Sequence, residues 1–184
     1  MPHLRRQLAL AATVLLVAGC GGAAYDGGRD SLPGPVPDDV TFVPVESTAV
    51  APPFSLKLLD GSSLDVATLW RDRPVVVFFT ASWCSRCATQ QEDFKPIVER
   101  YGDAVGFVGV AGRDKVDALK AWVSDHEVGY PVGIDPDQAT WRRYAVRTPP
   151  AVIVVAPGGK LIRGWPGGVA TEDLELALEA VVDD

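Results

Sequence analysis

The stretch "TASWCSRCATQ", residues 80–90, places Cys84 and Cys87 three positions apart, directly behind a tryptophan. Just before it, "PVVVFFT" at residues 74–80 is a continuous β-branched and aromatic run, which is typical of a strand buried on both faces. The residues that follow predict a helix from about Cys84 to Tyr101. The two cysteines are therefore expected where a buried strand ends and a helix begins.

A cysteine pair with this spacing can hold a metal, brace the fold or exchange disulfides. A structural zinc site needs four ligands, and beyond residue 20 the chain adds only His126 and no methionine to the pair. An inert bridge across so short a loop would add little stability, because it constrains few residues. We therefore expect no metal site and favour disulfide exchange.

The predicted helix start gives a chemical reason for that preference. Its unpaired N–H groups and positive dipole end would stabilise a thiolate on Cys84 and lower its pKa. Cys87 follows one turn later on the same face, where it could resolve a mixed disulfide formed by Cys84. Arg86, between them, would either favour the thiolate further or be a solvated surface arginine.

The rest of the folded chain alternates between strand and helix patterns. The expected elements are a hairpin around Asp60–Gly61, a buried strand at 104–112, a helix at 114–128, a short strand at 130–134, a helix at 137–146, a hairpin turned at Gly158–Gly159 and a closing helix at 171–182. This order predicts an α/β protein with a mixed sheet, helices on both faces and parallel early strands.

Two segments resemble the thioredoxin superfamily: "FFTASWCSRC" at 78–87 and "YAVRTPPAVIVVAPGGKLIRGWPGG" at 144–168. The hairpin at 54–64 and the insert at 113–146 are similar to its TlpA/DsbE-like branch of membrane-anchored or secreted thiol–disulfide oxidoreductases. The resemblance covers residues 54–184. It implies a thioredoxin-like mixed sheet flanked by helices, with an N-terminal β-hairpin and a central insert.

The same resemblance implies roles for individual residues. Cys84 is expected to be the exposed nucleophile and Cys87 the buried resolving thiol. Trp83 flanks them, either beside the site or packed in the core. Pro150 takes the position of the family's cis-proline, which faces the cysteines.

Three positions depart from the family pattern. Phe78 stands where many thioredoxins have a buried acid, and Gln90 stands where the TlpA-type branch often has a glutamate. The proton acceptor for Cys87 is therefore unassigned. Pro149 precedes the expected cis-proline and has no N–H, so backbone pairing with a substrate strand should be weaker there.

The N-terminus has the layout of an export signal. Arg5 and Arg6 precede an apolar stretch that ends in "VAGC" at 17–20, which resembles a bacterial lipobox. We expect residues 1–19 to be a signal peptide and Cys20 to be lipidated; the alternative is an ordinary signal peptide with Cys20 incidental. The glycine- and proline-rich residues 20–53 are expected to form a flexible linker, apart from a possible edge strand near 40–46.

Charge and composition limit the function further. A net charge of −7 argues against a nucleic-acid partner, and no apolar run after residue 20 is long enough to span a membrane. We expect a lipid-anchored monomer on the extracytoplasmic side of the cell membrane. It would oxidise or isomerise exported cysteine-containing proteins, use a membrane redox partner, and need no cofactor beyond the Cys84–Cys87 disulfide.

Two other functions stay open, and a third is weaker. The domain could be a membrane-anchored reductant for cytochrome c maturation, or a lipoprotein that uses a thioredoxin fold for binding without catalysis. A peroxidase is disfavoured, because Ala81 stands where the peroxiredoxin motif has a threonine.

Overall fold

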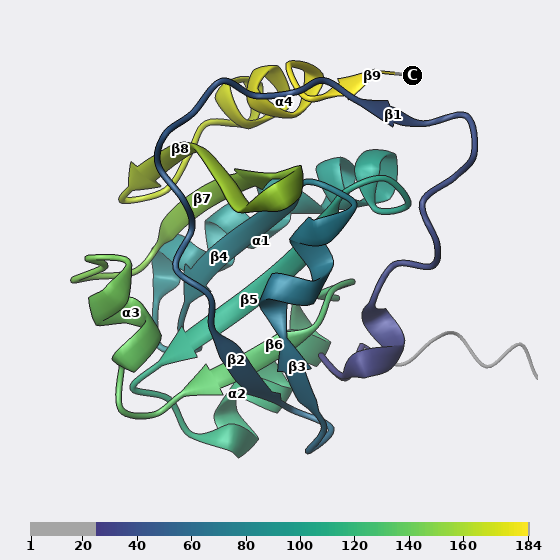
Figure 1. Ribbon diagram of the computed structural model, residues 1–184. Coiled ribbons are helices and arrows are strands. Elements are labelled where there is room, and N and C mark those ends of the chain that lie inside the picture. Colours follow the sequence, from purple (N-terminus) through teal and green to yellow (C-terminus); the bar gives the residue numbers. More distant parts are fainter. Residues whose placement is uncertain (1–24, 184) are drawn as a thin grey trace, which may run out of the picture.

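The computed structural model describes residues 25–183, so the expected signal peptide and Cys20 lie outside the described residues. Seven strands form one sheet in the order β3-β2-β6-β5-β4-β7-β8 (Figure 1). Their bounds are β2 (Ser55–Leu58), β3 (Ser63–Asp65), β4 (Val75–Thr80), β5 (Gly106–Gly112), β6 (Val132–Asp135), β7 (Ala151–Ala156) and β8 (Lys160–Pro166).

The sheet is mixed, as the order of patterns predicted. The central strands β4, β5 and β6 run parallel. The β2–β3 hairpin joins β6 in antiparallel sense, and the β7–β8 hairpin joins β4 in the same way. The two predicted hairpins therefore form the two ends of the sheet, and the strand that precedes the cysteines lies near its centre.

Helices cover both faces of the sheet. The α-helices are α1 (Ser85–Tyr101), α2 (Val116–Asp125), α3 (Ala139–Arg143) and α4 (Thr171–Glu179), and the 3-10 helices are η1 (Arg29–Ser31), η2 (Val66–Arg71) and η3 (Pro157–Gly159). Side chains of α1, α2 and α4 enter one core cluster, and side chains of η2 and α3 enter the other.

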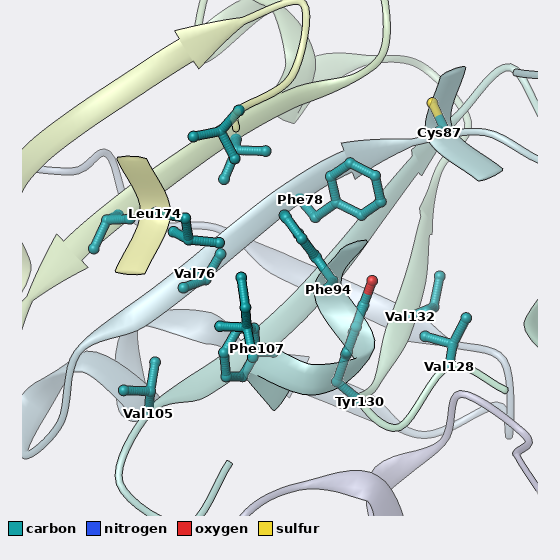
Figure 2. Close-up of a cluster of buried hydrophobic side chains, with 14 of the residues drawn as sticks. Val76, Phe78, Cys87, Phe94, Val105, Phe107, Val128, Tyr130, Val132 and Leu174 are labelled. Atoms are coloured by element: carbon teal, nitrogen blue, oxygen red, sulfur yellow. The ribbon is translucent and has the colours of Figure 1, made fainter. Parts of the chain in front are cut away.

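Strand β4 supplies side chains to both clusters. Val76 and Phe78 face the cluster that also contains Cys87, and Val77 and Phe79 face the opposite one. All six residues of the strand are buried. Figure 2 shows the first cluster, where the rings of Phe78 and Phe94 lie 5.0 Å apart. Burial on both faces explains why the segment is apolar at every position rather than at alternate ones.

Residues 25–53 do not form the flexible linker that their composition predicted. In Figure 1 this segment runs along the domain, and its strand β1 (Thr41–Phe42) pairs with β9 (Val182–Asp183). The carbonyl of Gly27 accepts a hydrogen bond from the N–H of Val132 at 2.9 Å. The segment lacks apolar residues for a core of its own, but backbone hydrogen bonds and the domain's core hold it in place.

Candidate active site

Cys84 and Cys87 form a disulfide at the junction of β4 and α1. Cys84 is the N-cap of α1, and its sulfur accepts a hydrogen bond from the backbone N–H of Cys87 at 3.1 Å. Cys84 is 8% exposed and Cys87 is 0% exposed, so Cys84 is largely buried rather than exposed as expected. The helix start therefore offers a backbone donor to the sulfur of Cys84, which is the more accessible of the two.

The turn that carries the pair is held by the segment after β5. The backbone N–H and the hydroxyl of Ser82 both donate to the carboxylate of Asp114. The indole N–H of Trp83 donates to the carbonyl of Arg113 at 3.0 Å, while its side chain is 55% exposed. Trp83 thus lies on the surface beside Cys84 rather than in the core. Our sequence reasoning missed Asp114, although the carboxyl ends of the parallel strands β4 and β5 must be neighbours.

Pro150 lies on the same side of the molecule as the cysteine pair. The peptide bond between Pro149 and Pro150 is cis, and the carbonyl of Pro150 accepts from the N–H of Gly167 at 2.8 Å. Pro150, Arg86 and Gly167 line one cavity of about 340 Å³. The structure therefore brings the expected cis-proline and the CxxC turn to one site.

Arg86 contacts the loop between β8 and α4. Its guanidinium donates to the carbonyl of Gly167 at 2.7 Å. The side chain is exposed, so this hydrogen bond lies at the rim of the cavity. The expected effect of Arg86 on the thiolate of Cys84 stays a prediction.

Gln90 is buried and pairs with the backbone of the same loop. Its amide N–H donates to the carbonyl of Val169 at 2.9 Å, and its oxygen accepts from the N–H of Val169 at 2.7 Å. Gly168, between Gly167 and Val169, has a left-handed φ of +99°. A side chain is disfavoured at this position, because its Cβ would lie only 2.6 Å from the side-chain oxygen of Gln90. Gln90 therefore fastens the loop to α1, and both ends of its amide are already engaged.

Neither Phe78 nor Glu92 is placed to accept a proton from Cys87. Phe78 packs inside the core. Glu92 is bound at the surface by Nδ1 of His126 and by Nζ of Lys95, both at 3.0 Å. The hydrogen bonds from His126 and Lys95 hold the pKa of Glu92 below its usual range, which makes it a weaker base. Asp93 is the one acid among the residues that line the cavity with Arg86 and Pro150.

Within residues 25–183, no three His, Cys, Asp or Glu side chains gather in a group that could hold a metal ion. In the same part of the chain, no helix has both the length and the apolar character needed to cross a membrane.

The fold and the site together define a thioredoxin-like protein with a cysteine pair at the start of its first long helix. The chain belongs to the AhpC/TSA family, whose sequence pattern matches residues 48–163. It is similar to the soluble secreted antigen MPT53 of Mycobacterium tuberculosis, with 30% identity over 106 residues, which are 58% of this chain and 60% of MPT53.

Two further comparisons cover more of the relative's length. The thiol-disulfide oxidoreductase ResA of Bacillus thuringiensis is 24% identical over 132 residues, which are 71% of this chain and 76% of ResA. The solved structure of MTB dsbF aligns with a TM-score of 0.64 and 30% identity, over 69% of this chain and 93% of that one. These likenesses confirm the predicted fold class. ResA is named as an oxidoreductase of the expected kind, and this chain carries a CxxC pair.

Proposed function

We propose that this protein is an extracytoplasmic thiol–disulfide oxidoreductase that oxidises or isomerises exported proteins through Cys84 and Cys87. The observation that carries the proposal is the asymmetry of the pair. The sulfur of Cys84 sits at the helix N-cap and accepts the Cys87 N–H, whereas Cys87 is fully buried. The less buried, stabilised sulfur suits attack, and the fully buried sulfur one turn away suits resolution.

Oxidation of a partner starts from the disulfide form. A thiolate of the partner attacks the Cys84 sulfur, the Cys84–Cys87 bond breaks, and Cys87 leaves as a thiolate that takes up a proton. A second partner thiolate then attacks the partner's sulfur in the mixed disulfide and expels the Cys84 thiolate. The partner loses two electrons and gains a disulfide, and the pair is reduced. Isomerisation starts instead from the Cys84 thiolate, which attacks a wrong disulfide in the partner.

The helix start supports the oxidising direction. Stabilising the Cys84 thiolate stabilises the reduced form, which makes the disulfide a stronger oxidant. The deciding measurement is the reduction potential of the pair against glutathione. We expect a value above about −270 mV, the potential of thioredoxin. A lower value would assign the protein to the reductants, as required for cytochrome c maturation.

Catalysis itself is tested by turnover of a dithiol. The protein should oxidise dithiothreitol with loss of its own disulfide, and Cys84→Ser should abolish the reaction. A folded protein whose disulfide does not react would instead be a binding module.

The extracytoplasmic location rests on the "VAGC" segment and on the likeness to a protein named as secreted. We propose attachment to the membrane through a lipid on Cys20, with exported cysteine-containing proteins and a membrane redox protein as partners. Mass spectrometry of the native N-terminus should show a diacylglyceryl group on Cys20. An unmodified N-terminus would leave the protein unanchored.

A further inference from the structure

A second hollow lies along the β7–β8 hairpin, apart from the cavity beside Arg86. Two cavities of about 380 and 530 Å³ adjoin there. Both are lined by Tyr144, Ala145, Ile153 and Gly164, so they form one continuous depression. We refer to it as the hairpin groove; residues 143–148 line one side and residues 161–166 line the other.

The shape of the hairpin groove follows from two local features. Gly164 pairs with Ile153 across β7 and β8, so no side chain stands beside Ile153 at this position. On the other side, Ala145 has a left-handed φ of 55°, and the N–H of Val146 returns to the carbonyl of Trp141 at 2.8 Å. This capped end of α3 turns the chain away and forms the opposite wall.

The hairpin groove leads to the redox site. Thr148, Ala151 and Pro166 line its end, and Ala151 pairs with Pro166. Pro150 lies between Thr148 and Ala151 in the chain, and it lines the other cavity together with Arg86. A segment lying in the groove would therefore reach the cysteine pair at one end.

The lining of the groove is apolar with a basic rim. Val50, which lies in the groove, is 59% exposed. Arg143, Arg147 and Arg163 are the charged residues of the lining, and no acid lines either cavity. None of the three arginines forms an ion pair with any residue from 25 to 183. Arg143 donates to the carbonyl of Pro53 and Arg163 lies over the ring of Trp165, but neither contact neutralises the positive charge. Three cations without a carboxylate partner, on a protein with a net charge of −7, indicate an acidic occupant.

The backbone of β8 favours an extended occupant. Lys160 and Leu161 contact Val50 and Ala49. Beyond them, the outer edge of β8 pairs with no other strand within the described chain. A free edge offers N–H and C=O groups to an added strand. At about 3.3 Å per residue, the part of β8 from Ile162 to Pro166 would match a segment of about five residues.

We infer that the hairpin groove binds an extended, apolar and acidic segment of the partner protein, adjacent to the cysteine that reacts with Cys84. The inference rests on the proposed function and adds the specificity of the partner. Apolar side chains of the segment would pack over Gly164, against half-buried Val146 and the 9% of Ile153 that is exposed, and its carboxylates would pair with Arg147 and Arg163.

The test compares two synthetic dithiol peptides that differ only in charge. One carries Leu-Glu-Val-Glu beside its cysteines and the other carries Leu-Lys-Val-Lys. The rate constant for oxidation by the disulfide form is measured for each at low salt. The acidic peptide should react about tenfold faster, as charge steering permits. The double variant Arg147→Glu/Arg163→Glu should reverse the preference. The double variant Arg71→Glu/Lys120→Glu makes the same total charge change at exposed positions outside the groove and should leave the preference unchanged.

A second variant tests the apolar floor. A Cβ at Gly164 would lie 3.6 Å from Ile153, an ordinary contact, so Gly164→Leu can fill the groove without a backbone clash. Gly164→Leu should lower the rate constants for oxidation of both peptides severalfold. The rate constant for dithiothreitol oxidation by the same variant should stay close to that of the unchanged protein. Equal rates for the two peptides, or a preference that survives the arginine changes, would overturn the inference while dithiothreitol is still oxidised. Failure to oxidise dithiothreitol would instead count against the proposed function.

Discussion

The side-chain amide of Gln90 forms two hydrogen bonds with the backbone of Val169, one to its carbonyl and one from its N–H, at 2.9 and 2.7 Å. The contact joins α1, which begins at the cysteine pair, to the loop that also binds Pro150 and Arg86. A glutamate at this position could accept from the N–H but could not donate to the carbonyl while ionised. The residue is therefore suited to fixing the loop rather than to moving a proton.

Gln90→Glu should destabilise the protein. A buried carbonyl would lose its donor and a carboxylate would be buried, so the free energy of unfolding should fall by about 1–3 kcal/mol at neutral pH. Urea unfolding would measure the change. Gln138→Glu is the matched control, because its oxygen accepts from Arg113 at the surface and a carboxylate can do the same. Equal stability of the two variants would show that the Gln90 contact contributes nothing measurable.

The two thiols of the reduced protein should react at different rates. Cys84 keeps a small exposed fraction and has a helix N–H at its sulfur, whereas Cys87 is fully buried. Iodoacetamide at neutral pH should label Cys84 first, as read by peptide mass mapping. Cys87→Ser should accumulate mixed disulfides with a partner, and Cys84→Ser should accumulate few. Equal labelling of both thiols would contradict the assigned roles.

Removal of Arg86 should make the disulfide less oxidising. Its positive charge lies one residue before Cys87 in the turn of the CxxC motif, where it would stabilise a thiolate on Cys84. Arg86→Ala should lower the reduction potential by tens of millivolts, since about 1.4 kcal/mol corresponds to roughly 30 mV. Arg86→Lys keeps the charge and should retain most of the potential. If the alanine variant keeps the original potential, the arginine acts only through its hydrogen bond to Gly167.

Acid should release the N-terminal segment from the β2–β3 hairpin. The carboxylate of Asp60 accepts from the backbone N–H of Arg29 at 2.8 Å and from that of Ser62 at 2.7 Å, and these bonds hold the pKa of Asp60 below its ordinary value of 3.8. A lowered pKa in the folded state means that the ionised form stabilises the fold. That contribution is complete above the unfolded-state pKa and is lost as pH falls through the lower, folded-state pKa.

Hydrogen exchange of residues 26–32 would follow this loss. Protection should decline as pH falls below about 4, after correction for the intrinsic pH dependence of exchange. In Asp60→Asn the protection should be reduced already at neutral pH and should vary less with acid. Because Asp60 is exposed, the effect should be local, and global stability should change little. An unchanged protection pattern in the variant would show that other contacts hold the segment.

The sequence predicted the centre of the fold better than its connections. The continuous apolar runs at β4 and β5 specify strands buried on both faces. The helix expected from residue 137 is likewise stabilised by a nearby residue, because the carboxylate of Asp135 accepts from the N–H groups of Ala139 and Trp141. These signals are local. The contact between Gln90 and Val169 joins residues 79 positions apart, and that between Asp114 and Ser82 joins residues 32 apart. No spacing rule within one element reveals such pairs.

Apart from the possible edge strand near 40–46, where β1 lies, the order in the N-terminal segment escaped prediction for a related reason. Its composition is that of a chain without its own core, and composition says nothing about a surface supplied by another part of the molecule. Val40, Phe42 and Val45 are the apolar residues that pack there. Each is isolated among prolines, acids and polar residues, so no periodic pattern marks them as buried.

If Cys20 carries a lipid, as we propose, the docking of residues 25–53 limits how far the domain can stand from that lipid. A free coil of the whole segment would span on the order of 30 Å. With the chain fixed against the domain from Tyr25 onward, the path back to Cys20 is at most about 18 Å even when fully extended. The domain would then stay close to the lipid headgroups, and its encounters would be confined to proteins that are themselves emerging from the bilayer or held at its surface.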